Sequence, residues 1–168
     1  AAIWKENGRP AATSAGELME TMVDYLLSRE LGKGIGTISD RLKEELEIFL
    51  AELAKEMHRR VVTVMPITEA RRCIRESWKQ LYESNRVVTP EENVLQAVFE
   101  NPLLTQFAGR IRFVHQLFQE FFAGWWLAEE LGRAPDQCDK YLADLWWSKP
   151  AMFAATLANP AICLPRLV

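Results

Sequence analysis

The segment from Arg112 to Trp126 constrains the fold of this chain more than any other part. A short β-prone run, Arg112 to Val114, leads directly into an apolar helical pattern, and His115 lies at the junction. Large apolar residues then recur every four positions in two neighbouring rows, which are Phe113, Leu117, Phe121 and Trp125, and Phe118, Phe122 and Trp126. Each step of four turns only about 40° around a helix, so the two rows form one broad apolar face.

Three polar residues, His115, Gln119 and Glu120, interrupt this apolar pattern. Burying large apolar side chains contributes roughly 1.5–3 kcal/mol each before conformational entropy is subtracted, so the helix is predicted to lie in the core. The three polar residues then need partners. Two interpretations stay open for Gln119 and Glu120: a hydrogen-bonded tether to a neighbouring domain, or partial exposure at the edge of the face. Gly124 costs about 1 kcal/mol relative to alanine inside a helix and predicts a close helix crossing.

Helical signals also fill the chain upstream of this segment. Ser14 followed by Glu17 is a capping box that predicts a helix over about 15–30. The apolar residues of that helix are Leu18, Met22, Tyr25 and Leu26. A long helix is predicted from about 40 to 60, and an extended piece over 61–65 that Pro66 ends. Thr68 then predicts a capped helix that runs to about Ser84.

The next signals complete a winged-helix order. Thr89-Pro90-Glu91-Glu92 predicts a helix start with Thr89 as the cap and a helix end near Asn101-Pro102. Two β-prone runs, 103–107 and 110–113, flank Ala108-Gly109 and predict a hairpin. Helix, helix, hairpin and helix follow one another as they do in a winged helix.

Two further helices are predicted after Gly132. The first is capped by Asp136 and runs to about Trp147, and the second runs from Ser148 to about Leu157. The pairs Trp125-Trp126 and Trp146-Trp147 are predicted to pack between helices rather than to form an interaction surface. The chain begins at Ala1 without a methionine and ends at Val168, and we expect it to be a segment of a longer protein.

Composition excludes several classes of protein. The net charge of −3 disfavours general nucleic-acid binding, which needs a basic excess. Cys73, Cys138 and Cys163 are far apart in sequence, which favours reduced thiols in a cytoplasmic setting over a disulfide framework or zinc site. The longest apolar run, Phe121 to Ala128, is far shorter than the roughly 20 residues of a membrane-spanning helix. No signal peptide is visible in the sequence.

The residues Phe113-Val114-His115-Gln116-Leu117-Phe118-Gln119-Glu120-Phe121-Phe122-Ala123-Gly124 carry a family resemblance. They resemble the motif that closes the winged-helix region of NACHT-type signalling ATPases, the NLR-like members of the STAND class. That motif reads aromatic-x-His-x-x-aromatic-Gln-Glu-aromatic-aromatic-Ala-Ala, and Gly124 departs from it. A weaker collinear resemblance covers about 9–132, and Leu50 to His58 looks like the long linking helix of the family.

The resemblance implies a mainly α fold in three parts. A helical subdomain covers 1–62, a winged-helix-like domain with a short β-hairpin covers 63–132, and a further helical region begins at 133–168. In that family a P-loop domain upstream binds ADP or ATP with magnesium, and a downstream sensor domain detects a ligand. Nucleotide exchange rotates the winged helix and exposes an oligomerisation surface. The partners implied are therefore these two domains and, on activation, further copies of the protein.

His115 matches the family histidine that contacts the β-phosphate of ADP. An imidazole can donate a hydrogen bond to phosphate, and such a charge-assisted bond is worth roughly 1.5–3 kcal/mol. The other interpretation is a histidine whose polar atoms are satisfied at the helix start. We expect no catalysis by this segment alone, because no Walker sequence or catalytic triad is visible. Gly32-Lys33-Gly34-Ile35-Gly36 has the wrong spacing for a phosphate loop and is predicted to be an interhelix loop.

Two alternative functions remain from the sequence. A DNA-binding winged-helix regulator needs a basic recognition helix and wing, and the wing offers only Arg110 and Arg112. Arg71, Arg75 and Lys79 share a helix face that is predicted to be solvated. A helical scaffold for protein partners is the other alternative. His58-Arg59-Arg60 lacks a second histidine or cysteine at metal spacing, so no metal site is predicted.

Overall fold

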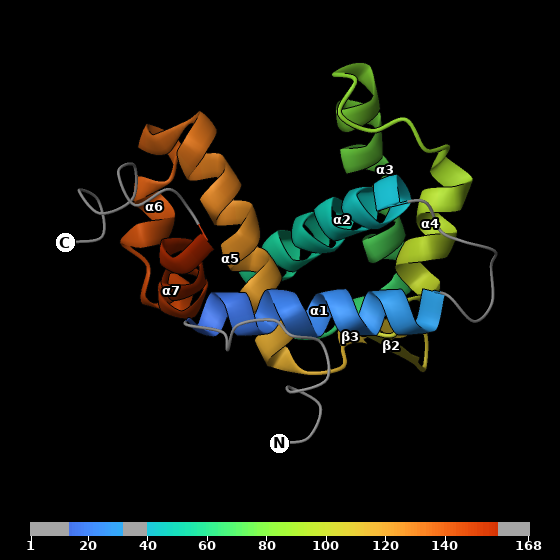
Figure 1. Cartoon of the computed structure of the whole chain (residues 1–168), viewed down its shortest axis with the longest axis horizontal. Helices are drawn as coiled ribbons and strands as arrows, with labels where there is room; N and C mark the ends of the chain where they lie inside the picture. Colours follow the sequence, from blue (N-terminus) through green and yellow to red (C-terminus); the bar gives the residue numbers. More distant parts are fainter. Residues whose placement is uncertain (1–13, 32–39, 158–168) are drawn as a thin grey trace, which may run out of the picture.

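The computed structural model describes residues 14–31 and 40–157 and is mainly helical, with one small antiparallel sheet (Figure 1). The α-helices are α1 (Ala15–Leu31), α2 (Asp40–Arg59), α3 (Ile67–Glu83), α4 (Glu91–Glu100), α5 (Gln116–Arg133), α6 (Asp139–Leu142) and α7 (Ser148–Leu157). The strands are β1 (Met65–Pro66), β2 (Leu104–Phe107) and β3 (Arg110–Phe113), and two 3-10 turns are η1 (Pro135–Gln137) and η2 (Leu145–Trp147). The predicted mainly α fold with a short hairpin is confirmed.

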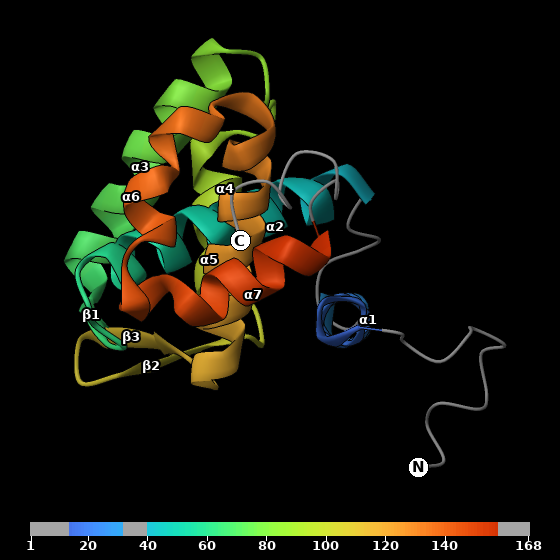
Figure 2. The same cartoon turned by 90° about the vertical axis from the view of Figure 1, so that its left-hand side faces the viewer.

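The sheet has the strand order β1-β3-β2, with β3 antiparallel to both neighbours. The turn between β2 and β3 is formed by Ala108 and Gly109, which have φ values of 46° and 72°. Two consecutive positive φ values make the tight turn whose twist suits a β-hairpin. The order α2, β1, α3, α4, β2, β3 is therefore that of a winged helix, and the hairpin is its wing. Figure 2 shows the three strands together at one end of the molecule.

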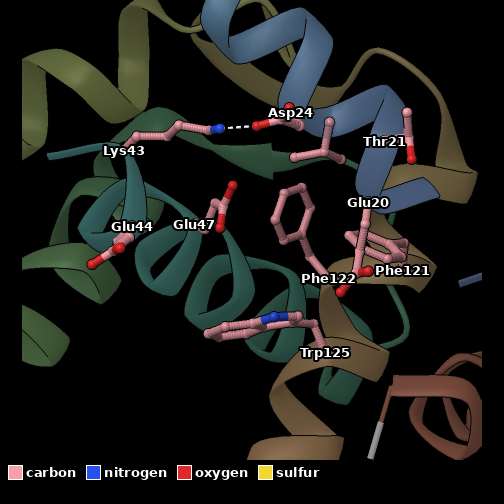
Figure 3. Close-up of a pocket in the computed structure, with 10 residues that line it drawn as sticks. Glu20, Thr21, Asp24, Lys43, Glu44, Glu47, Phe121, Phe122 and Trp125 are labelled. Carbon is pink, nitrogen blue, oxygen red and sulfur yellow. Dashed lines mark hydrogen bonds and ion pairs between the residues drawn. The ribbon is translucent and has the colours of Figure 1, made fainter. Parts of the chain in front are cut away.

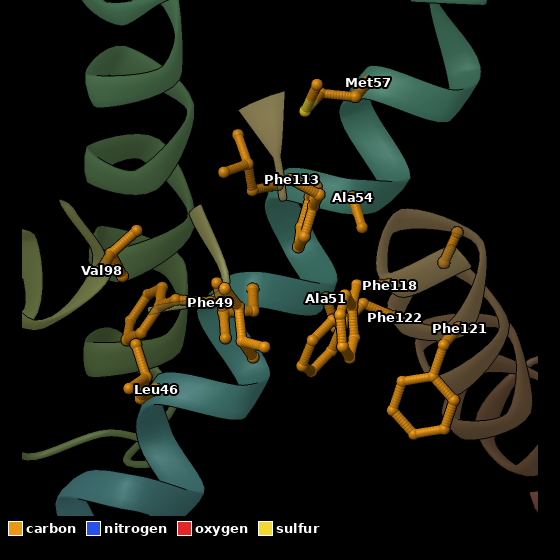
Figure 4. Packing of buried hydrophobic residues seen from close by; sticks show 14 of the residues in the cluster. Leu46, Phe49, Ala51, Ala54, Met57, Val98, Phe113, Phe118, Phe121 and Phe122 are labelled. Atoms are coloured by element: carbon orange, nitrogen blue, oxygen red, sulfur yellow. The ribbon is translucent and has the colours of Figure 1, made fainter. Parts of the chain in front are cut away.

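The core is built around α2, which packs against α3 and α4 on one side and against α5 on the other (Figure 4). Fully buried side chains of α2 include Phe49, Leu53 and Met57. Phe121 and Phe122 of α5 are buried with them in one contiguous apolar cluster. This cluster includes residues of all three predicted parts, 1–62, 63–132 and 133–168, and their division into domains stays a prediction.

Helix α7 packs across α5 (Figure 2), and the two helices approach each other closely at Gly124. A Cβ atom built on Gly124 would lie 2.6 Å from the carbonyl oxygen of Pro150 and 2.7 Å from the Cβ of Phe153. Both distances are too short for a side chain, so only glycine allows this approach of the two helices. The close helix crossing predicted from Gly124 is therefore confirmed.

The apolar faces of α1 and α5 differ in part from the prediction. In α1 the buried large apolar residues are Met19, Val23 and Leu27, whereas the expected apolar residues Leu18, Met22 and Tyr25 are exposed. In α5 Leu117 is exposed, and Trp125 and Trp126 are only partly buried. Both helices carry more apolar residues than one packed face can cover, so periodicity alone does not select the buried set.

Two predicted helix caps are wrong, and one predicted extended piece is shorter than expected. Helices α3 and α4 begin after Pro66 and Pro90, and neither has a side-chain cap, so Thr68 and Thr89 do not cap them. The extended piece expected over 61–65 is reduced to β1, because Val61 has a φ of 57° in the left-handed region.

The continuous helix expected from Asp136 to Trp147 is instead divided into η1, α6 and η2. The physical reason lies at Asp144, whose carboxylate accepts a hydrogen bond from the backbone N–H of Trp146 at 2.9 Å. A short acidic side chain that bonds the nearby backbone competes with continued helix and starts a new turn. The last helix over 148–157 is confirmed.

Candidate functional site

His115 forms the N-cap of α5, directly after the wing. Its backbone is extended, with φ −143° and ψ 140°, and its Nδ1 accepts a hydrogen bond from the backbone N–H of Leu117 at 3.1 Å. Because Nδ1 accepts, the proton of the neutral ring lies on Nε2. Nε2 makes no hydrogen bond with the described residues, and the side chain is exposed. The ring therefore presents an N–H donor to the surroundings of the helix N-terminus.

Gln119 and Glu120, in the first turns of α5, differ in burial and in their hydrogen-bond partners. Gln119 is only 1% exposed, and its Nε2 donates to the backbone carbonyl of Val62 at 3.0 Å. This bond ties α5 to the turn that follows α2. Glu120 is half-buried and accepts a hydrogen bond from Gln116 at 2.9 Å. A contact of either residue with another domain stays a prediction.

A groove of about 530 Å³ lies between α1, α2 and α5, next to the aromatic rows of α5 (Figure 3). Its apolar lining is Val23, Phe121, Phe122 and Trp125. Its charged lining is Glu20, Asp24, Lys43, Glu44 and Glu47, and within it Lys43 pairs with Asp24. Four carboxylates therefore share the groove with one ammonium group.

Two of these carboxylates, Glu20 and Glu47, have raised pKa values. Burial raises the pKa of Glu47 above its ordinary value, and the charges of Asp24, Glu20 and Glu44 add to that rise against the opposing charge of Lys43. The pKa of Glu20 is also raised, mainly by burial. Sequence reasoning missed this groove, because its residues come from three helices and share no local pattern.

Glu45 is a buried carboxylate that fixes the loop before α4. It is 3% exposed, and its two oxygens accept hydrogen bonds from the backbone N–H groups of Val88 and Thr89, each at 3.1 Å. Arg41 also donates to it at 3.2 Å. Burial raises the pKa of Glu45, but these hydrogen bonds outweigh burial and hold it below its ordinary value. A carboxylate in such bonds is a structural clamp between α2 and α4.

The facing surfaces of α2 and α3 carry a balanced network of ion pairs around Cys73. Arg60 bridges Glu56 at 2.6 Å and Glu69 at 2.5 Å, and Lys55 pairs with Glu52. Burial raises the pKa of the Cys73 thiol to about 12, which keeps it protonated at neutral pH. The thiol of Cys138 is buried on the other side of the core and donates to the carbonyl oxygen of Ala134.

The surfaces that a winged helix uses on DNA are not basic here. The exposed residues of α4, which holds the place of a recognition helix, are Glu92, Asn93, Gln96 and Glu100. Arg112 of the wing lies over the ring of Phe107, at 5.3 Å from its centroid. Arg71, Arg75 and Lys79 of α3 are exposed as predicted, and Arg75 pairs with Glu91 at 2.8 Å.

His58 is a residue whose position sequence reasoning did not anticipate. It lies in the last turn of α2, is 2% exposed and contacts both tryptophans of the pair Trp146-Trp147. Trp126 contacts Trp147 and Tyr141 through their rings, so the predicted packing role of the tryptophan pairs is confirmed for these residues. No local signal marks His58, because its partners follow 88 residues later.

Within residues 14–31 and 40–157, no group of three or more histidine, cysteine, aspartate or glutamate side chains has a geometry that could hold a metal ion. None of the helices in those ranges is long and apolar enough to cross a membrane. The glycine loop expected over 32–36 lies outside the described residues. No known family model matches the chain, and no curated protein matches it.

Proposed function

We propose that this chain is the regulatory helical and winged-helix segment of a NACHT-like STAND ATPase. It contacts bound ADP or ATP through His115 and couples the nucleotide state to domain rearrangement and signalling. The observation that carries the proposal is the Nε2–H of His115, which faces outward at the N-terminus of α5 directly after a wing.

The chemistry of this position suits a phosphate group. The N-terminus of a helix carries a partial positive charge, and anions are stabilised there. The Nε2–H of His115 adds a donor whose direction is fixed by the bond from Leu117 N–H to Nδ1. This donor is available in the neutral ring, so the contact does not require protonation. In the parent protein the magnesium nucleotide would be held mainly by the P-loop domain.

Coupling follows from the way α5 is embedded. Its first turns hold His115 and also Gln119, which bonds the turn after α2, and its middle packs closely on α7 at Gly124. A displacement of the N-terminal end of α5 would therefore disturb its contacts with both α2 and α7. One hydrogen bond cannot operate the switch alone, since moving an equilibrium from 1:99 to 99:1 takes about 5.5 kcal/mol. The remainder comes from packing against the P-loop and sensor domains and from self-association.

The test is an ADP titration of the parent protein that carries the P-loop domain. We expect His115→Ala to weaken ADP binding by about 1–3 kcal/mol, which is about 5–150-fold. His115→Ser keeps an N-cap acceptor and removes the imidazole, so it separates the cap from the nucleotide contact. Gln116→Ala is the matched surface control on the next residue.

Each outcome of this titration decides one point. Weaker binding in both His115 variants, with Gln116→Ala unchanged, supports the nucleotide contact. Loss in His115→Ala alone assigns His115 to capping only. Unchanged affinity in both variants removes His115 from the nucleotide site and contradicts the proposal.

A further inference from the structure

Two reciprocal hydrogen bonds join the end of α2 to η2. Nε2 of His58 bonds the backbone carbonyl oxygen of Trp146 at 2.8 Å, and Nε1 of Trp146 donates to the backbone carbonyl oxygen of His58 at 3.0 Å. The imidazole also stacks on the Trp146 ring with centroids 5.1 Å apart and meets Trp147 edge-on at 4.8 Å. This cluster of three rings fastens η2 onto the end of α2.

The bonding pattern fixes the tautomer of the neutral His58 ring. A carbonyl oxygen only accepts, so Nε2 carries the proton and Nδ1 of the neutral ring is bare. Nδ1 is buried and has no hydrogen-bond partner. Among the residues that the structure describes, no other buried side-chain nitrogen or oxygen atom lacks a partner. A second proton would place an N–H donor, and a positive charge, in a position with no acceptor.

The charged groups that act on the ring come from two other parts of the chain. Glu120 of α5 and Asp144, just before η2, both favour a protonated ring, as does the bond to Trp146. Burial acts in the opposite direction and outweighs them, so the pKa of His58 lies below its ordinary value. Trp147, which covers the ring edge-on, is 3% exposed, so water has little access from that side.

We propose that His58 is a proton-sensitive latch that holds residues 139–147, which span α6 and η2, on the end of α2 while its ring is neutral and releases them when Nδ1 is protonated. The latch depends on the contacts of His58 with η2 and not on nucleotide. It gives the molecule a way to loosen α6 and η2 in mildly acidic surroundings without unfolding the wing.

The direction of the pH effect follows from linkage. The released state protonates near the ordinary histidine pKa of about 6.5, and the latched state resists protonation until lower pH. The latch is therefore at full strength above about pH 6.5 and weakens as the pH falls toward the lower pKa of the latched state. For each unit of pKa difference, the ratio of latched to released molecules falls by up to about tenfold.

Nuclear magnetic resonance tests the protonation step directly, because the chain has only two histidines. The titration of both imidazole Cε1–H signals is followed in the wild-type chain, and His115→Gln assigns the signals by removing one of them. We expect the His58 signal to titrate below the ordinary histidine value of about 6.5. A His58 signal that titrates at or above the ordinary histidine value overturns the proposal.

Hydrogen exchange tests the release. We expect amides of residues 139–147 to exchange faster near pH 5 than near pH 7.5, after correction for intrinsic rates. His58→Gln keeps a side-chain N–H donor for Trp146 but cannot titrate, so this acid response should disappear. His115→Gln should retain it. An acid response that persists in His58→Gln, or its absence from the wild type, overturns the latch, and the titration above still decides if that variant does not fold.

Discussion

The two histidines of the described chain occupy opposite environments at two helix ends. Each bonds one ring nitrogen to backbone, but His58 donates through Nε2 to a carbonyl oxygen, whereas His115 accepts through Nδ1 from an N–H group. The remaining nitrogen is buried in His58 and exposed in His115. The comparison teaches that the role of a histidine depends on which nitrogen is bonded and where the other one faces.

The difference arises from the range of the contacts. The bond of His115 to Leu117 spans two residues, so it forms with the helix start. The bonds of His58 to Trp146 span 88 residues and exist only when η2 has returned to α2. Changes in long-range packing should therefore affect the surroundings of His58 strongly and those of His115 little.

The largest effect is expected from Trp147→Ala, which removes part of the buried surroundings of His58. Trp147 is 3% exposed and contacts the rings of His58, Trp126 and Tyr141. Its truncation should lower the free energy of unfolding by about 3–5 kcal/mol, as measured by urea denaturation. Leu145→Ala is the control, since Leu145 is 89% exposed and its loss should stay within about 0.5 kcal/mol. Equal effects of the two variants would contradict the packing described here.

The next effect concerns the crossing of α5 and α7, which brings η2 back to α2. Gly124→Ala forces a methyl group against Pro150 and Phe153, so we expect a loss of about 1–3 kcal/mol in unfolding free energy. Gly132→Ala is the matched control in the same helix, because a Cβ there meets no atom within 4 Å. It should be neutral or stabilise the protein by up to about 1 kcal/mol. A neutral Gly124→Ala in thermal and urea unfolding would show that the crossing relaxes easily.

Glu45 is a second buried titratable group, and its effect on stability is expected at a lower pH than that of His58. Glu45→Gln loses one acceptor oxygen for the N–H groups of Val88 and Thr89, and we expect a loss of about 1–3 kcal/mol near neutral pH. The folded-state pKa of Glu45 is lowered, so its stabilisation is present above its ordinary value and is lost as the pH falls below about 4.5. This pH window lies below that of His58. Urea unfolding of Glu45→Gln and His58→Gln across pH should therefore separate the two pH-dependent losses of stability.

The smallest effect should be that of His115→Ala on stability. It removes the N-cap bond to Leu117 and should cost about 0.5–1 kcal/mol, whereas His115→Ser should recover most of this loss. Thermal unfolding of the two variants measures the difference. A loss of several kcal/mol in His115→Ala would contradict the local and exposed character of the residue.

Local patterns predicted the elements whose stabilisation is local or periodic. The hairpin around Ala108-Gly109 and the start of α5 at His115 follow from residues within a few positions of one another. The single helix expected after Asp136 was wrong because one side chain, Asp144, competes for the backbone. Helix type and order were therefore predictable, and exact caps were not.

The contacts that define sites depend on residues distant in sequence. The clamp at Glu45 joins residues more than 40 positions apart, and the groove combines α1, α2 and α5. The sequence predicted only that His58 is not part of a metal site, and no sequence pattern indicates its actual partners, Trp146 and Trp147. The nucleotide contact that we propose for His115 rests on a sequence motif, and only the fold shows that Nδ1 is bonded to the backbone and that the side chain is exposed.

The reactivity of the two described cysteines, Cys73 and Cys138, can report local opening of the structure. Cys73 lies between α2 and α3 with a pKa near 12, and Cys138 is fully buried beside α5, so alkylating reagents that need a thiolate should be slow at both in the closed molecule. Their labelling rates, resolved by peptide mass, therefore measure how often each side of α2 opens. Release of the segment after α5 should speed the modification of Cys138 and leave Cys73 unreacted.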